Sequence, residues 1–140
     1  MVDANVAIKW LIDEPLHEAA IGLIGGRISL YAPSLILAEI DHALCKKARN
    51  GEITARHAQV AGEYIAAYFD SLYPVENLTQ RALQIALQLA LPVYDCFYLA
   101  CSENLGMPLV TADERLLKTV QATPFAAQIV SIASLAPLKA

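Results

Sequence analysis

Apolar positions along the chain follow two spacings that alternate from one end to the other. Short apolar runs predict strands at residues 1–3, 30–32, 71–75, 108–110 and 127–133. Apolar residues three and four positions apart predict helices over residues 34–49, 52–68, 77–90, 95–104 and 111–120. This alternation indicates an α/β domain with a mainly parallel sheet covered by helices on both faces. No repeat or linker divides the chain, so we expect a single domain over residues 1–140.

The composition adds an expectation about partners and location. Of the 140 residues, 56% are hydrophobic and 17% are charged. The hydrophobic share exceeds that of a typical globular domain, which predicts an oligomer or a bound partner. The longest uncharged run, 119–138, contains two prolines and several polar residues and does not suit a membrane-spanning helix. The first residues lack the pattern of a secretory signal, so we expect a cytoplasmic protein. The three cysteines form no CxxC pair, which argues against disulfides or structural zinc.

The charge and the glycine pattern narrow the classes of ligand. A net charge of −4 gives no general attraction for nucleic acid, so a phosphate-bearing substrate would need a bound cation or a local basic patch. Lys46, Lys47 and Arg49 end the predicted helix 34–49, where basic residues suit either RNA phosphates or the helix dipole. The GLIGG run over 22–26 has neither Rossmann nor Walker spacing and falls in a predicted helix, so no nucleotide cofactor is indicated.

Three acidic residues from distant segments fall at one edge of the predicted sheet. Asp3 ends the first strand, and Asp113 follows the strand at 108–110. A helix that leads back into a parallel strand runs antiparallel to it, which places the first turn of the Asp95 helix at the same edge. Ligands of open α/β sheets bind at the carboxyl ends of the strands. The three acids are therefore predicted to converge on one site.

Each acid also has a structural explanation. Asp95 sits in a first helical turn, where an acid interacts favourably with the helix dipole. Thr111 is a potential N-cap with Glu114 as its capping-box partner, which would make the segment around Asp113 an ordinary helix start. The joint placement of the acids argues for a shared chemical role.

Clustered carboxylates repel one another unless a cation lies between them. Oxygen ligands favour Mg²⁺ or Mn²⁺, and such ions activate water and neutralise a phosphodiester. A fourth acid would come from the helix 34–49, which offers both Glu39 and Asp41. Helical spacing does not decide between the two.

Three segments together resemble the PIN domains, and within them the VapC-like ribonuclease toxins of bacterial and archaeal toxin–antitoxin pairs. They are VDANVAIKW (2–10), PSLILAEIDHAL (33–44) and PVYDCFYLACSENLGMPLVTADERL (92–116), in this order and spacing. The resemblance selects Glu39 over Asp41. It implies a catalytic quartet with two supporting polar residues: Asp3, Glu39, Asp95 and Asp113, supported by Asn5 and Thr111.

The resemblance implies a three-layer α/β/α domain with a central, mainly parallel five-stranded sheet. It implies a metal-dependent endoribonuclease in which Asp3, Asp95 and Asp113 bind Mg²⁺ or Mn²⁺, and Glu39 positions water at the metal or a second ion. The implied partners are an RNA substrate, with tRNA as one candidate, a cognate VapB-like antitoxin that inhibits the enzyme, and a second copy in a homodimer.

The sequence departs from the family pattern at two places. Only Met1 and Val2 precede Asp3, whereas the family usually has a few more residues of first strand. His42 stands where many relatives carry Asn, and we assign it a hydrogen-bonding role rather than a catalytic one.

Two other functions stay open at this point. A phosphatase with an aspartyl nucleophile shares the DAN motif, but Asn5 replaces the second aspartate that such enzymes normally carry. A non-catalytic PIN-like module would use its apolar surface to bind a partner, with acids that only begin helices.

Overall fold

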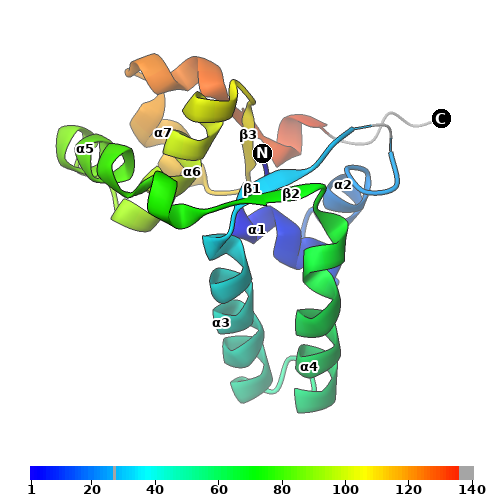
Figure 1. Cartoon of the computed structure of the whole chain (residues 1–140). Helices are drawn as coiled ribbons and strands as arrows, with labels where there is room; N and C mark the ends of the chain where they lie inside the picture. Colours follow the sequence, from blue (N-terminus) through cyan, green and yellow to red (C-terminus); the bar gives the residue numbers. More distant parts are fainter. Residues whose placement is uncertain (27, 136–140) are drawn as a thin grey trace.

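The computed structural model describes residues 1–26 and 28–135 and contains two pairs of parallel strands (Figure 1). Strand β1 (Tyr31–Pro33) pairs with β2 (Ser71–Tyr73), with Tyr31 opposite Ser71. Strand β3 (Leu109–Thr111) pairs with β4 (Ile129–Ser131), with Leu109 opposite Ile129. All four strands alternate with helices along the chain, which confirms the α/β class.

The first residues of the chain connect the two pairs. The Val2 amide donates to the Tyr31 carbonyl at 2.9 Å, and Val2 forms a parallel bridge with Val110. The Val110 amide donates to Met1, and the Asp3 amide donates to Val110. Met1–Asp3 therefore lie between β1 and β3 and direct Asp3 to the carboxyl edge of both strands. In the described residues this segment is a single bridge, so the continuous five-stranded sheet between two helical layers stays a prediction.

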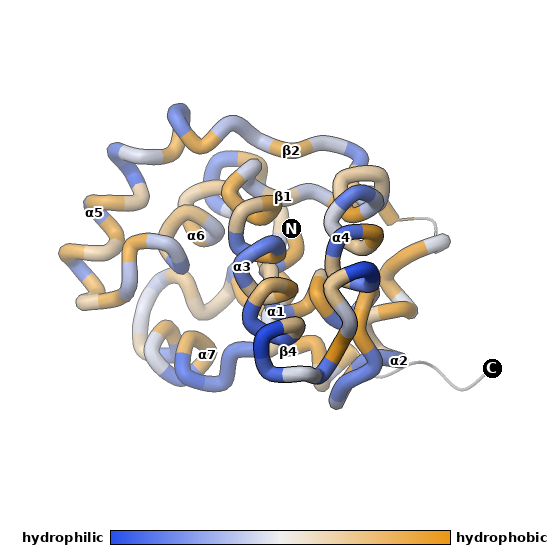
Figure 2. Tube along the Cα trace, turned by 90° about the horizontal axis from the view of Figure 1, so that it is seen from below, coloured by the Kyte–Doolittle hydropathy of each residue, from blue (hydrophilic) through white to orange (hydrophobic). Residues whose placement is uncertain are grey.

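Two long helices form a hairpin that projects from the body of the molecule (Figure 1). Helix α3 (Leu35–Arg49) ends at Asn50, and Gly51 adopts a φ of +74° that permits the reversal. Helix α4 (Ala55–Tyr64) begins at Thr54, whose hydroxyl accepts a hydrogen bond from the His57 amide. The tip of the hairpin is hydrophilic (Figure 2). A short 3₁₀ helix, η2 (Ile65–Tyr68), completes the helical segment predicted over 52–68.

Helix α6 (Val93–Leu105) is the most deeply buried helix that bears a predicted site residue. It packs against α5 (Thr79–Leu89), and Ala90 in the left-handed region, with φ +53°, makes the connection. Its buried face consists of Cys96, Tyr98, Leu99, Ala100, Cys101 and Ser102. Helix α7 (Glu114–Val120) follows β3. The remaining helical segments are α1 (Ala4–Ala7), η1 (Ile8–Trp10), α2 (His17–Ile21), η3 (Val75–Asn77), η4 (Pro124–Gln128) and η5 (Ile132–Leu135).

The structure corrects two sequence predictions. Thr111 is the last residue of β3, and Asp113 is the N-cap of α7, so the predicted capping box of Thr111 and Glu114 is wrong. The GLIGG segment follows α2 as turns and bends, so its assignment to a helix is also wrong. Glycine destabilises helix interiors, which accounts for the early end of α2.

No single helix among residues 1–26 and 28–135 has the length and apolar character needed to cross a membrane. Helices α5 and α6 meet that test only together, as a pair bent by 117°. The last residues of the uncharged run 119–138 lie outside the described part of the chain.

Candidate active site

The four predicted carboxylates come from four separate elements and lie close enough for their charges to affect one another's pKa. Asp3 precedes α1, Glu39 lies on α3, Asp95 lies in the first turn of α6, and Asp113 precedes α7. Asp3 is close enough to Asp95 and Glu39 for both to raise its pKa. Asp113 and Glu39 have the same effect on the pKa of Asp95. The fold thus brings together the four acids that the family resemblance selected.

Asp3 is an acid buried in the core, with 6% of its surface exposed. Although it stands at the N-cap of α1, its carboxylate makes no capping hydrogen bond there. One oxygen, Oδ2, instead accepts a hydrogen bond of 2.9 Å from the Thr111 hydroxyl. Burial, and then the charges of Asp95 and Glu39, raise the pKa of Asp3 to about 7, although the Thr111 hydrogen bond opposes the shift. A carboxylate in this setting is poised to gain a proton or a cation.

Asn5 and Thr111 form a hydrogen-bonded clamp around Asp3. Asn5 Nδ2 donates to Thr111 Oγ1 at 3.2 Å, and Asn5 Oδ1 accepts from the Ala112 amide at 3.0 Å. Thr111 Oγ1 also accepts from the Asp113 amide at 3.1 Å. The clamp therefore ties α1 to the loop between β3 and α7 and fixes two of the acids relative to each other.

Glu39 is held by a residue that sequence reasoning missed. The Tyr98 phenol donates a hydrogen bond of 2.6 Å to Glu39 Oε1, and Tyr98 has only 1% of its surface exposed. Burial raises the pKa of Tyr98 above its ordinary range, and the charges of Asp3 and Glu39 add to this, so Tyr98 keeps its proton and acts as a donor. Burial also raises the pKa of Glu39, while the hydrogen bond from Tyr98 lowers it. The spacing of Tyr98 three residues after Asp95, on the same face of a helix, is the signal that could have found it.

Asp41, the alternative to Glu39, lies elsewhere. It is exposed and lines a groove between α3 and α4 together with Leu44, Ala48 and Ala58. The geometry therefore groups Glu39, and not Asp41, with the other three acids.

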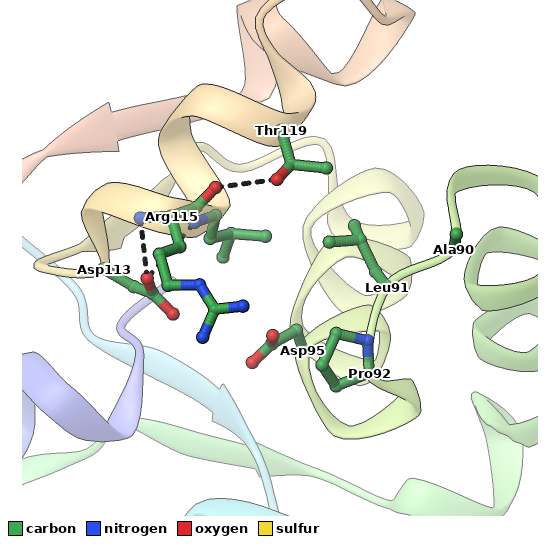
Figure 3. Close-up of a pocket in the computed structure, with 8 residues that line it drawn as sticks. Ala90, Leu91, Pro92, Asp95, Asp113, Arg115 and Thr119 are labelled. Carbon is green, nitrogen blue, oxygen red and sulfur yellow. Dashed lines mark hydrogen bonds between the residues drawn. The ribbon is translucent and has the colours of Figure 1, made fainter.

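Asp95 and Asp113 face a cavity of about 310 Å³ (Figure 3). Its other lining residues are Ala90, Leu91, Pro92, Arg115, Leu116 and Thr119. Burial, and then the charges of Asp113 and Glu39, raise the pKa of Asp95 to about 6, and Arg115 partly offsets this rise. The Arg115 side chain extends from α7 toward Asp95 (Figure 3). Asp113 Oδ1 accepts from the Arg115 and Leu116 amides at 3.0 and 3.2 Å, so Asp113 itself, in place of the predicted Thr111, caps α7 alongside any chemical role.

The donor set fits a hard divalent cation by its chemistry. Carboxylate oxygens are the ligands that Mg²⁺ and Mn²⁺ prefer. Burial, and then the charges of the neighbouring acids, raise the pKa values of Asp3 and Asp95, and a cation beside them would oppose both effects. However, within the described residues, no three His, Cys, Asp or Glu side chains are arranged as a ready-made metal site. One oxygen of Asp113 is engaged at the start of α7 and one of Asp3 by Thr111. The carboxylates of Asp3, Asp95 and Asp113 would supply the oxygens that hold the cation.

Comparison with known proteins identifies the family of this arrangement. The family model for the PIN domain matches residues 1–121. The chain belongs to the PIN domain family. This PIN domain is 35% identical over 119 residues to Ribonuclease VapC1 of Mycobacterium tuberculosis, an alignment that covers 83% of the chain and 86% of that relative. It is 33% identical over 122 residues to VapC ribonuclease Mb0985 of Mycobacterium bovis, with coverages of 87% and 91%.

A more distant relative extends the similarity beyond mycobacteria. This PIN domain is 27% identical over 118 residues to Ribonuclease VapC3 of Pyrobaculum aerophilum, with coverages of 83% and 90%. The resemblance to PIN domains and VapC proteins that the sequence motifs indicated is thus confirmed over most of the chain.

Proposed function

We propose that this PIN domain is a VapC-like toxin, a metal-dependent endoribonuclease that hydrolyses phosphodiester bonds of RNA and is inhibited by a cognate VapB-like antitoxin. The observation that carries the proposal is the convergence of four carboxylates from four elements, with raised pKa values at Asp3, Glu39 and Asp95. Perturbed acids at a cleft are typical of catalytic sites. The names of the VapC relatives supply the class of reaction.

The proposed cofactor is Mg²⁺ or Mn²⁺, held by Asp3, Asp95 and Asp113. When bound, such a cation neutralises negative charge on the phosphodiester and makes water more acidic. Asn5 and Thr111 keep the Asp3 carboxylate oriented through the hydrogen bonds described above. Arg115 adds a positive charge beside Asp95, where it offsets part of the negative charge of the acids and of an RNA phosphate.

Glu39 is the proposed base and positioning group for water. Its Oε1 accepts from Tyr98, which leaves Oε2 to accept a hydrogen bond from a water molecule. As the water oxygen bonds to phosphorus in line with the leaving oxygen, one P–O ester bond breaks. The hydroxyl of the water stays on phosphorus, Glu39 takes its second proton and later releases it to solvent, and the leaving oxygen takes a proton from solvent. The sum is the addition of one water across one ester bond.

The remaining proposals concern organisation. We propose that residues 1–140 form one domain, that the protein forms a homodimer, and that it acts on RNA in the cytoplasm, with tRNA as a first candidate substrate. The apolar composition and the exposure of Leu83 and Leu87 on α5, at 53% and 77%, support an interface with a second copy or the antitoxin.

The test of this function is cleavage of tRNA and other structured RNAs by the purified, partner-free protein with Mg²⁺, Mn²⁺ or EDTA. The expected result is internal cleavage that requires a divalent cation and is lost in an Asp95→Asn variant whose circular dichroism matches the wild type. Equal cleavage by the variant would contradict the role of Asp95. Failure of the folded wild type on every RNA with every cation would instead favour a non-catalytic binding module.

A further inference from the structure

A second cavity lies beside Glu39. It measures about 500 Å³, and its lining residues are Leu35, Ala38, Glu39, His42 and Tyr94. Glu39 belongs both to this cavity and to the acid cluster, and Tyr94 directly precedes Asp95. The cavity therefore borders the proposed site of cleavage at Glu39, and its volume suits a small planar group.

Tyr94 is an aromatic residue left open at the start of a buried helix. Its side chain is 59% exposed, whereas Tyr98, one turn later on α6, is 1% exposed. An exposed ring beside apolar carbons and a histidine offers a stacking surface of the kind that single-stranded RNA uses. Stacking needs no base-specific hydrogen bonds, so this surface suits a nucleobase next to the reacting phosphate.

A polar stripe leads from this cavity along α3. Glu39, His42, Lys46 and Arg49 follow at intervals of three, four and three residues, which places them on one helical face. The opposite face carries the buried Ile36, Ile40 and Leu44, and the groove toward α4 contains Asp41, Cys45 and Ala48. His42, Lys46 and Arg49 are exposed to solvent, and the stripe from Glu39 to Arg49 rises about 15 Å along the helix.

The two basic residues of the stripe differ from their neighbour Lys47. Lys47 Nζ lies 2.8 Å from Glu14 Oε2 on the inner side of the helix, so its charge is already paired. Lys46 and Arg49 are both exposed on the outer side. In a protein of net charge −4, they supply the local basic patch that an RNA backbone needs.

We propose that single-stranded RNA leaves the acid site over this surface. The base beside the scissile phosphate stacks on Tyr94 in the cavity next to His42, and the following phosphates lie along Lys46 and Arg49. This inference rests on the proposed ribonuclease function, and it assigns to the protein a sequence-tolerant contact with unpaired nucleotides adjacent to the cut. RNA in which those nucleotides are paired would not reach the Tyr94 ring.

The first test measures binding of fluorescein-labelled single-stranded RNA by fluorescence anisotropy under conditions that prevent cleavage. The wild type is measured in EDTA, and the Asp95→Asn variant is measured in Mg²⁺. Tyr94→Ala is expected to raise Kd roughly 5- to 150-fold, the equivalent of about 1–3 kcal/mol for one stacked base, and Tyr94→Phe to retain binding. Tyr64→Ala is the matched control, because Tyr64 is 62% exposed on α4 and lies outside the cavity. Similar melting temperatures of the variants establish that the fold is kept.

The second test measures the salt dependence of the same binding. Lys46→Gln and Arg49→Gln are each expected to lower the slope of log K against log salt by about 0.7, the value for one phosphate contact on a single strand. Tyr94→Ala weakens binding without changing the slope. Arg56→Gln on α4 is the control for total charge, and its slope is expected to equal that of the wild type.

The outcomes separate this inference from the proposed nuclease. If Tyr94→Ala binds RNA as tightly as the wild type, the proposed stacking on Tyr94 is wrong, even where the wild type cleaves RNA. If neither the wild type nor Tyr94→Ala binds any single-stranded RNA, the proposed stacking is also wrong. If that variant instead loses affinity only for an antitoxin peptide, the surface belongs to a protein partner and the inference is again overturned. Tyr94-dependent RNA binding by a protein that never cleaves would support the path and count against the nuclease.

Discussion

The Tyr98 phenol donates a hydrogen bond of 2.6 Å to Glu39 Oε1 and joins the buried helix α6 to the projecting helix α3. This contact fixes the one acid of the site that the sequence left ambiguous. It also lowers the pKa of Glu39 against the effect of burial, so Glu39 stays ionised over a wider pH range.

Removal of this hydrogen bond is expected to weaken catalysis and shift its pH dependence. In Tyr98→Phe, the pKa of Glu39 rises because the carboxylate loses its donor. The acid limb of the cleavage profile then moves to higher pH, with a rate loss of roughly 10-fold or more. Tyr73→Phe is the control, since its phenol also loses a partner, Asn104 at 2.8 Å, which lies near the C-terminal end of α6, nine residues after Asp95. An unchanged pH profile in Tyr98→Phe would show that Tyr98 has only a packing role.

The two acids of the α3 helix give a matched pair of variants. Glu39→Gln is expected to reduce cleavage by about 100-fold or more, because a general base typically contributes that much. Asp41→Asn is expected to leave cleavage within about 2-fold, since Asp41 is exposed toward α4. Single-turnover rates on one RNA measure both. A larger loss in Asp41→Asn than in Glu39→Gln would reverse the assignment.

The buried Asp3 makes the stability of the metal-free protein depend on pH. Its pKa rises from 3.8 to about 7 on folding, so between these values the folded state binds more protons than the unfolded state. The contribution of Asp3 is therefore most favourable at low pH and is lost as the pH rises toward 7, by up to about 1.4 kcal/mol per pH unit. Above that pH, a divalent cation that binds the folded state restores stability.

Urea denaturation in EDTA at pH 5 to 8 measures this effect. Asp3→Asn is expected to be more stable than the wild type at pH 8 and to show a flatter dependence on pH. Asp13→Asn, at an exposed position, is expected to follow the wild type. A wild-type curve that coincides with Asp3→Asn at every pH would show that the carboxylate is not strained by burial.

The clamp around Asp3 predicts a specific role for the Thr111 hydroxyl. Thr111 is 0% exposed, and its hydroxyl bonds both Asp3 and the Asp113 amide. Thr111→Val keeps the shape but leaves these groups without a partner, so it is expected to reduce the free energy of unfolding by about 1–3 kcal/mol and to weaken cation binding. Thr111→Ser keeps the hydroxyl and is expected to retain both. Equal stability of the valine and serine variants would contradict the clamp.

Periodicity predicted the order of strands and helices, because each long segment carries several turns of consistent apolar spacing. It did not predict α1 and η1, since Ala4–Trp10 is too short for a helical period to emerge. The end of β3 was misjudged because Thr111 and Asp113 are both good N-cap residues, and only the backbone decides which one takes that position.

The candidate site was predictable to a different degree at each residue. Asp3, Asp95 and Asp113 followed from the rule that parallel strands end at one edge of a sheet. Glu39 required the family resemblance, because its selection depends on a contact with Tyr98 on a helix 59 positions away. Contacts between distant segments leave no periodic trace in the sequence, which is why the hydrogen bond between Tyr98 and Glu39 and the cavity beside Tyr94 emerged only from the structure.

We propose that the converging acids act as one cation-dependent site for RNA cleavage. The decisive experiment measures Mn²⁺ binding and RNA cleavage on the same samples of wild type, Asp95→Asn and Asp41→Asn. Asp95→Asn is expected to lose both cation binding and cleavage, while Asp41→Asn is expected to keep both. Cleavage by Asp95→Asn at the wild-type rate, with Mn²⁺ binding intact, would contradict this proposal.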